Sequence, residues 1–121
     1  MSKICYGSMN IPLSPAVRAG DFVYISGQVP VVSGQIVGES IEEQTDVCLK
    51  NLVEILKTAG CEIDDVIKCF CILPDVKDFP GFNASYAKVF HTNPPARTTV
   101  GSALAGPFKV EIEAVAYKPL K

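Results

Sequence analysis

One stretch of this sequence, residues 66 to 73, is almost continuously apolar. It reads Val-Ile-Lys-Cys-Phe-Cys-Ile-Leu, is rich in residues that favour β-strands, and is closed by Pro74. Side chains alternate between the two faces of a strand, so such a run predicts a central strand that is covered on both faces. The rest of the chain must therefore supply cover for the sheet that contains this strand.

Two segments have the periodicity of helices that could provide this cover. Residues 40–43, Ser-Ile-Glu-Glu, fit a capping box, and the apolar positions that follow recur with helical spacing up to Ala59, where Gly60 supplies a stop. The second segment, residues 79–90, carries apolar side chains at helical spacing despite Pro80 in its first turn. We expect both segments to be helices.

The other β-rich segments lie towards the two ends of the chain. We expect a hairpin turn at residues 18–21, strands at residues 22–25, 97–104 and 109–117, and a short extended region at residues 31–38. This order predicts a single α+β domain over residues 1–121, in which two helices cover one face of a mostly antiparallel sheet. Because two helices cannot cover both faces, oligomerisation through the open face is the simplest way to bury the other, and it would place pockets between subunits.

Charge and composition exclude several classes of function. The 11 Lys and Arg residues nearly balance the 13 Asp and Glu residues, and the net charge is -2. The positive field that binds a phosphate backbone is therefore missing, and no nucleic-acid partner is expected. Residues 1–10 carry one Lys and no long apolar run, so neither a signal peptide nor a membrane span is predicted, and we expect a cytoplasmic protein.

The residue types that bind metals do not form a metal-site pattern. Cys69 and Cys71 would share one face of the apolar strand, and we interpret them as buried structural thiols. The single histidine, His91, stands at a helix end, where a surface or capping role is typical. No second Cys pair has the spacing of metal ligands, so no metal site is predicted.

The residues most suited to chemistry are near the C-terminus. Glu111 and Glu113 share one face of the strand expected at residues 109–117, and Arg97 begins the preceding strand with no acidic residue among its neighbours. A planar guanidinium binds both oxygens of a carboxylate, so an arginine near carboxylates in an inter-subunit pocket is suited to a small carboxylate ligand. A salt bridge between Arg97 and a glutamate that only joins subunits is the alternative, and the spacing alone does not separate the two.

Five short motifs occur in order over essentially the whole chain. They are SPAVRAGD at residues 14–21, ISGQVP at 25–30, FNASY at 82–86, PARTTV at 95–100 and VEIEAVA at 110–116. Together they resemble the Rid family, also called the YjgF family, whose best-known members are enamine/imine deaminases. The resemblance implies a chorismate-mutase-like fold and a homotrimer with three inter-subunit pockets.

The same resemblance implies a reaction. Reactive 2-enamino or 2-imino acids, such as 2-aminoacrylate and 2-iminopropanoate, would be hydrolysed to a 2-keto acid and ammonia. An imine already hydrolyses in water, so an enzyme needs only to orient it and deliver a water, and no metal or organic cofactor is required. The expected partners are small 2-imino and 2-keto acids and other copies of the chain, with no membrane.

Family motifs also imply roles for particular residues. Arg97 matches the arginine that holds the substrate carboxylate, and Glu111 matches the glutamate that positions and activates the attacking water, whereas Glu113 is expected to be structural. The other pocket-lining positions that the resemblance implies are Ser26, Gly27, Asn83, Thr99 and Leu13.

Two of these positions depart from the usual family residues. Thr99 stands where many relatives carry Cys, so a thiol is not needed for this chemistry. Leu13 stands where the family usually has a tyrosine. The loss of one hydroxyl group removes a hydrogen bond worth about 0.5 to 1.5 kcal/mol, so we expect activity to survive with an altered substrate preference.

Two other functions remain open at this point. A non-catalytic trimeric module could bind small carboxylates or 2-keto acids through the same Arg97 pocket, because one fold can host both roles. Ribonuclease or translation-inhibitor activity is attributed to some relatives of this family. The net charge of -2 and the lack of a run rich in Lys and Arg argue against that activity here.

Overall fold

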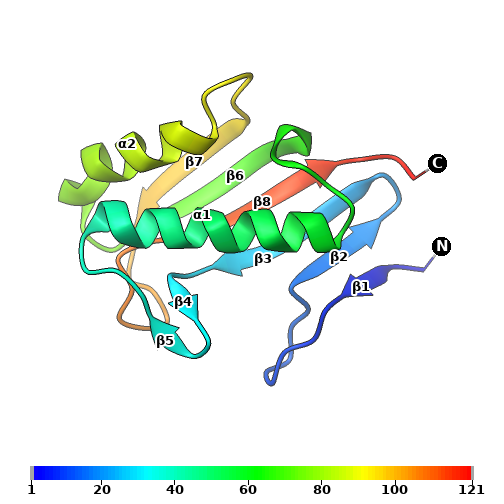
Figure 1. The fold of residues 1–121 in the computed structure, drawn as a ribbon, viewed down its shortest axis with the longest axis horizontal. Coiled ribbons are helices and arrows are strands. Elements are labelled where there is room, and N and C mark those ends of the chain that lie inside the picture. Colours follow the sequence, from blue (N-terminus) through cyan, green and yellow to red (C-terminus); the bar gives the residue numbers. More distant parts are fainter. Residues whose placement is uncertain (1, 121) are drawn as a thin grey trace.

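The computed structural model describes residues 2–120 as two helices packed against one six-stranded sheet, with a separate two-stranded sheet beside it (Figure 1). The strands are β1 (Ile4–Tyr6), β2 (Ala16–Ala19), β3 (Phe22–Gln28), β4 (Val31–Val32), β5 (Gln35–Ile36), β6 (Val66–Leu73), β7 (Ala96–Gly101) and β8 (Glu111–Tyr117). The helices are α1 (Ile41–Thr58) and α2 (Phe79–Val89), with short 3-10 turns η1 (Ile63–Asp65) and η2 (Val76–Asp78). The predicted α+β class is confirmed.

The main sheet has six strands in the order β1-β2-β3-β8-β6-β7. Neighbouring strands are antiparallel except for β6 and β7, which are parallel. Parallel neighbours need a crossover connection, and α2 forms the central part of that connection. The crossover leaves β7 at the edge of the sheet, directly beside the helix that precedes it.

Local signals account for the N-terminus of α1. The Ser40 hydroxyl oxygen accepts a hydrogen bond from the Glu43 backbone N–H at 3.1 Å, and the Glu43 carboxylate accepts one from the Ser40 backbone N–H at 3.0 Å. These backbone donors have no partner within the helix, so the predicted capping box satisfies them. The hydrogen bond from the Ser40 backbone N–H, together with one from the Glu39 backbone N–H, lowers the pKa of the Glu43 carboxyl group.

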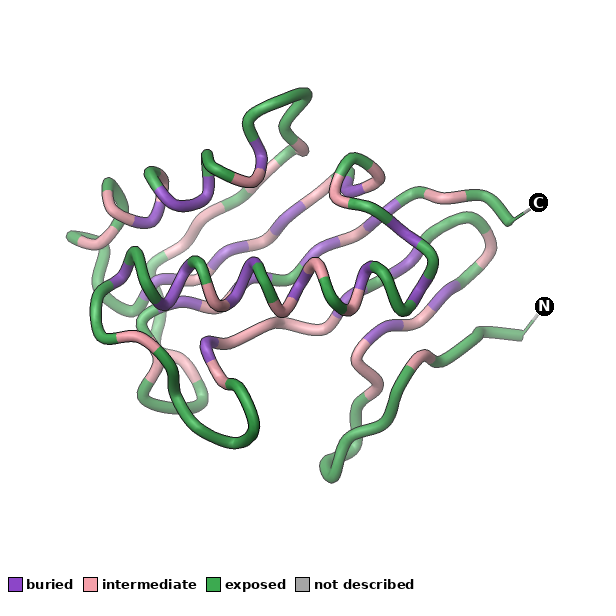
Figure 2. The backbone as a smooth tube through the Cα atoms, viewed as in Figure 1, coloured by how far each residue is buried: buried purple, intermediate pink, exposed green. Residues whose placement is uncertain are grey.

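Both helices lie on the same face of the sheet and bury it (Figures 1 and 2). In β6, the side chains of Cys69, Cys71 and Leu73 are buried on this face. On the other face, Phe70 and Ile72 remain half-buried, so the chain by itself does not cover the second face of its central strand. The sequence predicted an apolar sheet face that the two helices cannot reach, and the structure shows it.

The ends of the last two strands differ from the expectation. β7 ends at Gly101 rather than Leu104, because its partner β6 stops at Leu73 and offers no further ladder positions. β8 begins at Glu111 rather than Lys109, whose backbone N–H donates to the Gln44 side chain at 2.9 Å instead of to a strand.

The prediction that Arg18 lies in a hairpin turn is wrong. Arg18 belongs to β2, and only 3% of it is exposed. Its guanidinium donates to the Lys118 carbonyl oxygen at 2.6 Å and to the Gly20 carbonyl oxygen at 3.2 Å. The hydrogen bond to Lys118 attaches the segment after β8 to β2.

The described part of the chain contains no helix with the length and apolar character needed to cross a membrane.

Replacing Ser40 by Ala should lower the free energy of unfolding by about 1 kcal/mol, the usual effect of losing an N-cap hydroxyl. Urea denaturation followed by circular dichroism measures this change. Ser8→Ala is the matched control, because Ser8 is exposed and lies outside the helices and strands. An equal effect of both substitutions would contradict the role given to the capping box.

Candidate functional site

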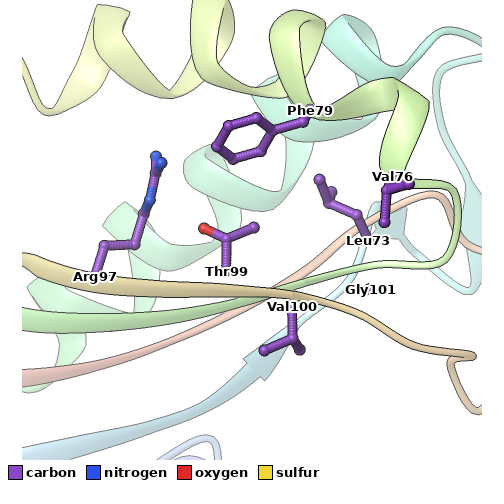
Figure 3. A pocket seen from close by; sticks show the side chains of 7 residues that line it. All are labelled: Leu73, Val76, Phe79, Arg97, Thr99, Val100 and Gly101. Carbon is purple, nitrogen blue, oxygen red and sulfur yellow. The ribbon is translucent and has the colours of Figure 1, made fainter.

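A pocket opens between the edge strand β7 and the start of α2. Its volume is about 450 Å³, and its lining residues are Leu73, Val76, Phe79, Arg97, Thr99, Val100 and Gly101. Figure 3 shows Arg97 and Thr99 rising from β7 toward α2, with Phe79 above them. Because no strand of residues 2–120 pairs with the outer side of β7, the pocket is accessible from the edge of the sheet.

Arg97 is held by aromatic rings rather than by an acidic side chain. Its guanidinium carbon lies 5.6 Å from the ring centroid of Phe79, 5.4 Å from that of Phe82 and 4.8 Å from that of Tyr86. Such distances are typical of cation–π contacts. Among residues 2–120 no carboxylate lies within salt-bridge distance of Arg97. The charge is therefore positioned but not neutralised.

Thr99 lies two residues further along the same face of β7. Arg97 is paired with Cys69 and Thr99 with Cys71, and both cysteines face the helices. The Thr99 hydroxyl oxygen is buried and has no hydrogen-bond partner in the described structure. The pocket thus presents one cation and one unpaired hydroxyl group, which together can hold a small anion with a polar atom. We refer to Arg97, Thr99 and the apolar residues of this pocket as the arginine half-site.

Glu111 lies at the start of β8, against the backbone of β3. A side chain at Gly27 would overlap the carboxylate of Glu111, so only glycine leaves room for it there. Partial burial is the main cause of a raised pKa for Glu111, and the neighbouring charge of Glu113 adds to it. A carboxylate with a raised pKa is a better proton acceptor than an ordinary surface glutamate.

Ser26, which precedes Gly27 in β3, forms hydrogen bonds with the loop before β2. The Ser26 hydroxyl donates to the Ser14 carbonyl oxygen at 2.7 Å, and its backbone N–H donates to the Pro15 carbonyl oxygen at 3.0 Å. These bonds attach residues 14 and 15 to β3, and Leu13, which is 42% exposed, directly precedes them in the chain. We refer to Leu13, Ser26, Gly27 and Glu111 as the glutamate half-site.

The two half-sites lie on opposite faces of the sheet within one chain. Arg97 is paired with Cys69, on the face under the helices, whereas Glu111 is paired with Ile72, on the open face. Positions 69 and 72 of one strand point to opposite sides. One copy of the chain therefore does not present Arg97 and Glu111 on the same side of its sheet.

The other residues singled out in the sequence lie outside the pocket lining. Asn83 is half-buried, one turn after Phe79 on the same face of α2, but does not line the pocket. Glu113 is exposed on the open sheet face. His91 is exposed and interacts with Thr92, in agreement with the surface role predicted for it. Within residues 2–120, no group of three metal-ligating side chains comes together.

Cys69 and Cys71 are buried free thiols, as predicted. Burial raises the pKa of both, that of Cys71 to about 12, and thiols of this kind are poor nucleophiles.

Several pocket residues were not found from the sequence. Phe79 was expected only as part of the buried face of a helix, and Val76 and Gly101 had no assigned part. Apolar side chains at helical spacing indicate a core, so their pattern contained no sign of a pocket. The one available signal was the absence of acidic neighbours around Arg97.

Comparisons with known proteins identify relatives of this chain. The sequence model of the family described as Endoribonuclease L-PSP matches residues 8–118. The chain is 42% identical over 110 residues to the human 2-iminobutanoate/2-iminopropanoate deaminase, covering 88% of this chain and 80% of that protein. It is 44% identical over 110 residues to a RutC family protein of Saccharolobus solfataricus, covering 88% of this chain and 87% of that protein.

Among solved structures, the chain resembles yeast Mmf1 with a TM-score of 0.93 and 32% identity, over 97% of this chain and 99% of that one. A family match over nearly the whole chain, together with relatives more than 40% identical, leads to one conclusion. This chain belongs to the L-PSP endoribonuclease family, also known as the YjgF or Rid family.

Proposed function

We propose that this protein hydrolyses 2-imino acids to 2-keto acids and ammonia, in pockets that are completed by a neighbouring copy of the chain. The observation that carries this proposal is Arg97, a cation in an open pocket with no carboxylate partner in the described chain. A site of this kind is suited to an anionic ligand. The human relative, named a 2-iminobutanoate/2-iminopropanoate deaminase, supports the identity of that ligand.

Arg97 fixes the substrate through its carboxylate. The three rings of α2 restrict the guanidinium, so little side-chain freedom is left to lose when the substrate binds. Two parallel N–H···O bonds then orient the carboxylate and with it the neighbouring imine carbon. Thr99 provides a hydroxyl group on the same wall, within reach of a polar atom of the substrate.

Glu111 of the neighbouring copy acts as the general base. Its ionised carboxylate takes a proton from water while the water oxygen bonds to the imine carbon, and it passes this proton to the imine nitrogen, which gives a carbinolamine. Glu111 then transfers the hydroxyl proton of the carbinolamine to its nitrogen, so that the C–N bond breaks, ammonia leaves, and the carbonyl of the 2-keto acid remains. Gly27 leaves the room that the Glu111 carboxylate needs to lie directly on the backbone of β3.

The site needs two copies because its halves lie on opposite sheet faces. The open face also carries aromatic side chains that a monomer would leave in water, including Tyr24, 51% exposed, and the Phe22–Tyr117 pair with ring centroids 5.4 Å apart. Contact of this face with the β7 edge of a second copy would bury these rings. It would also bring Glu111 toward Arg97, and repetition of the contact around a ring gives the proposed homotrimer.

Multi-angle light scattering should give a mass of three times 13.0 kDa at micromolar concentration. Tyr24→Lys places a charge on the open sheet face opposite Val115, with no carboxylate across the strand, and should lower the mass to that of one chain, because an unpaired buried charge is costly. A wild-type protein that is monomeric at this concentration would contradict the proposed assembly and the completed pocket with it.

Replacing Arg97 and replacing Glu111 should have different effects. Arg97→Ala should weaken 2-keto acid binding by tenfold to a hundredfold, corresponding to a free energy on the order of 1.5 to 3 kcal/mol, and should remove turnover as well. Glu111→Gln should leave binding close to normal and reduce kcat by roughly a hundredfold. Calorimetry with a 2-keto acid and the rate of keto-acid formation from imines generated by an amino-acid oxidase measure the two effects.

Two further variants make this comparison specific. Gly27→Ala should reduce kcat in the same way as Glu111→Gln with little loss of stability, because the new methyl group displaces a flexible carboxylate. Glu54→Gln, on the exposed side of α1, is the control for the loss of one carboxylate. If wild type binds 2-keto acids through Arg97 but accelerates the hydrolysis of no imine, the protein is a binding module and not an enzyme.

The pH dependence should reflect the surroundings of Glu111. A general base must be ionised, so kcat/KM should fall as the pH decreases through the pKa of Glu111. Because Glu113 contributes to raising that pKa, Glu113→Gln should shift this acid limb to lower pH. A pH profile of kcat/KM for both proteins tests this expectation, and a shift to higher pH would show that another group controls the limb.

A further inference from the structure

We infer that Gln28 is a positioning residue for the proposed reaction, which acts on the Glu111 carboxylate through the shape of β3. The inference rests on the proposed function and adds a residue to it. The side chain of Gln28 closes a bulge in β3, and this bulge contains Gly27, against which the Glu111 carboxylate lies.

The bulge is visible in the register between β3 and β8. Over the interval from Ile25 to Gln28, three steps along β3 match two steps along β8. Such a mismatch is a β-bulge, in which two residues of one strand take a position that normally holds one, and bulges are frequent beside active sites. Both ends of the interval are paired with buried residues of β8, so Ser26 and Gly27 share the one position between them that belongs to the open face.

Hydrogen bonds hold this bulge in shape. The side-chain amide of Gln28 donates to the Ser26 carbonyl oxygen at 2.9 Å, which joins the end of the bulge to its beginning. The Ser26 backbone N–H and hydroxyl group donate instead to the carbonyl oxygens of Pro15 and Ser14, at 3.0 and 2.7 Å. Those two bonds attach the bulge to the loop before β2, whereas the bond from Gln28 restrains it within β3.

Contact with Gly27 locates the Glu111 carboxylate. A Cβ atom on residue 27 would overlap this carboxylate and lie 2.8 Å from its carboxyl carbon, so the carboxylate lies directly on the bulged backbone. Burial and the charge of Glu113 account for the raised pKa of Glu111, and no hydrogen bond from residues 2–120 contributes to it. Because no donor holds the carboxylate, a change in the shape of the bulge moves it.

The contacts of Arg97 within the chain are independent of this bulge. In the sheet, β8 and β6 separate β7 from β3, and the Arg97 guanidinium packs against the rings of α2. Loss of the Gln28 amide should therefore slow the chemical step and leave the binding of a carboxylate unchanged. A residue needed only for folding would not separate these two quantities.

The test replaces Gln28 by Met, which keeps the length of the side chain and removes the donor. Gln28→Met should reduce kcat for the imine of alanine, made in the assay by an amino-acid oxidase, at least tenfold, because a displacement of about 1 Å can cost about a hundredfold in rate. The Kd of pyruvate, measured by calorimetry, should stay within twofold of wild type. Gln35→Met, the same change at an exposed residue of β5, should alter neither quantity. A smaller decrease in kcat, or a Kd that weakens in parallel with it, overturns the inference.

Titration of the Glu111 carboxyl group is a second measurement, and it needs no activity. Burial is the main cause of the raised pKa of Glu111, so a carboxyl group released from the bulge should titrate at lower pH in Gln28→Met than in wild type or Gln35→Met. NMR of the carboxyl carbon, assigned with Glu111→Gln, measures this shift. If wild type accelerates no imine, the proposed function fails and this titration alone decides the inference, which equal pKa values in wild type and Gln28→Met overturn.

Gln28→Glu covers the case in which Gln28→Met does not fold. It keeps the size of the side chain, but a carboxylate can only accept a hydrogen bond and repels the Ser26 carbonyl oxygen. At alkaline pH, where Glu111 is ionised, this variant should show the same loss of kcat with unchanged binding of pyruvate, and Gln35→Glu is the control for the added charge. A folded Gln28→Glu protein with the kcat of wild type overturns the inference.

Discussion

The structure depends on an imbalance between one sheet and two helices. α1 and α2 bury one face of the six-stranded sheet and leave the other face to be covered by something else. Phe70 and Ile72 of β6 lie half-buried on this second face, and apolar side chains left partly in water on a sheet face favour association. The position of the candidate site follows from the same imbalance, since Glu111 lies on the open face.

The second constraint is an unpaired arginine. A carboxylate next to Arg97 within the chain would have occupied the guanidinium and left no binding capacity for a ligand. Three aromatic rings fix its position without competing for its N–H groups, since a ring face attracts a cation but accepts no bidentate hydrogen bonds. α2 therefore has two roles, to cover the sheet and to orient the arginine.

Because the candidate site is divided between two sheet faces, the proposed activity depends on association of the chains. Neither half-site has all the groups that the reaction needs: one has a cation and a hydroxyl group, and the other has a carboxylate with a raised pKa. The chemistry we propose requires both, so a change that prevents association should abolish turnover even when it lies far from Arg97. The same division allows the apolar residues of the arginine half-site to vary without changing the groups that react.

Local signals in the sequence determined the start of α1, the central strand and two of the candidate site residues. The start of α1 follows from Ser40 and Glu43, two residues whose side chains satisfy each other's backbone N–H groups, and the central strand follows from the composition of residues 66–73. Arg97 and Glu111 were identified as candidates because family motifs and the lack of acidic neighbours are both visible in the chain.

Only the tertiary structure decided how these parts face one another. Arg18 is buried because a carbonyl group 100 residues away accepts its hydrogen bond, a contact that no local pattern contains. The opposite orientation of Arg97 and Glu111 depends on the register of three strands, and a shift of one residue would reverse it. Phe79 and Val76 became pocket residues because β7 lies at the sheet edge beside α2, whereas their apolar side chains, taken alone, indicate only a core.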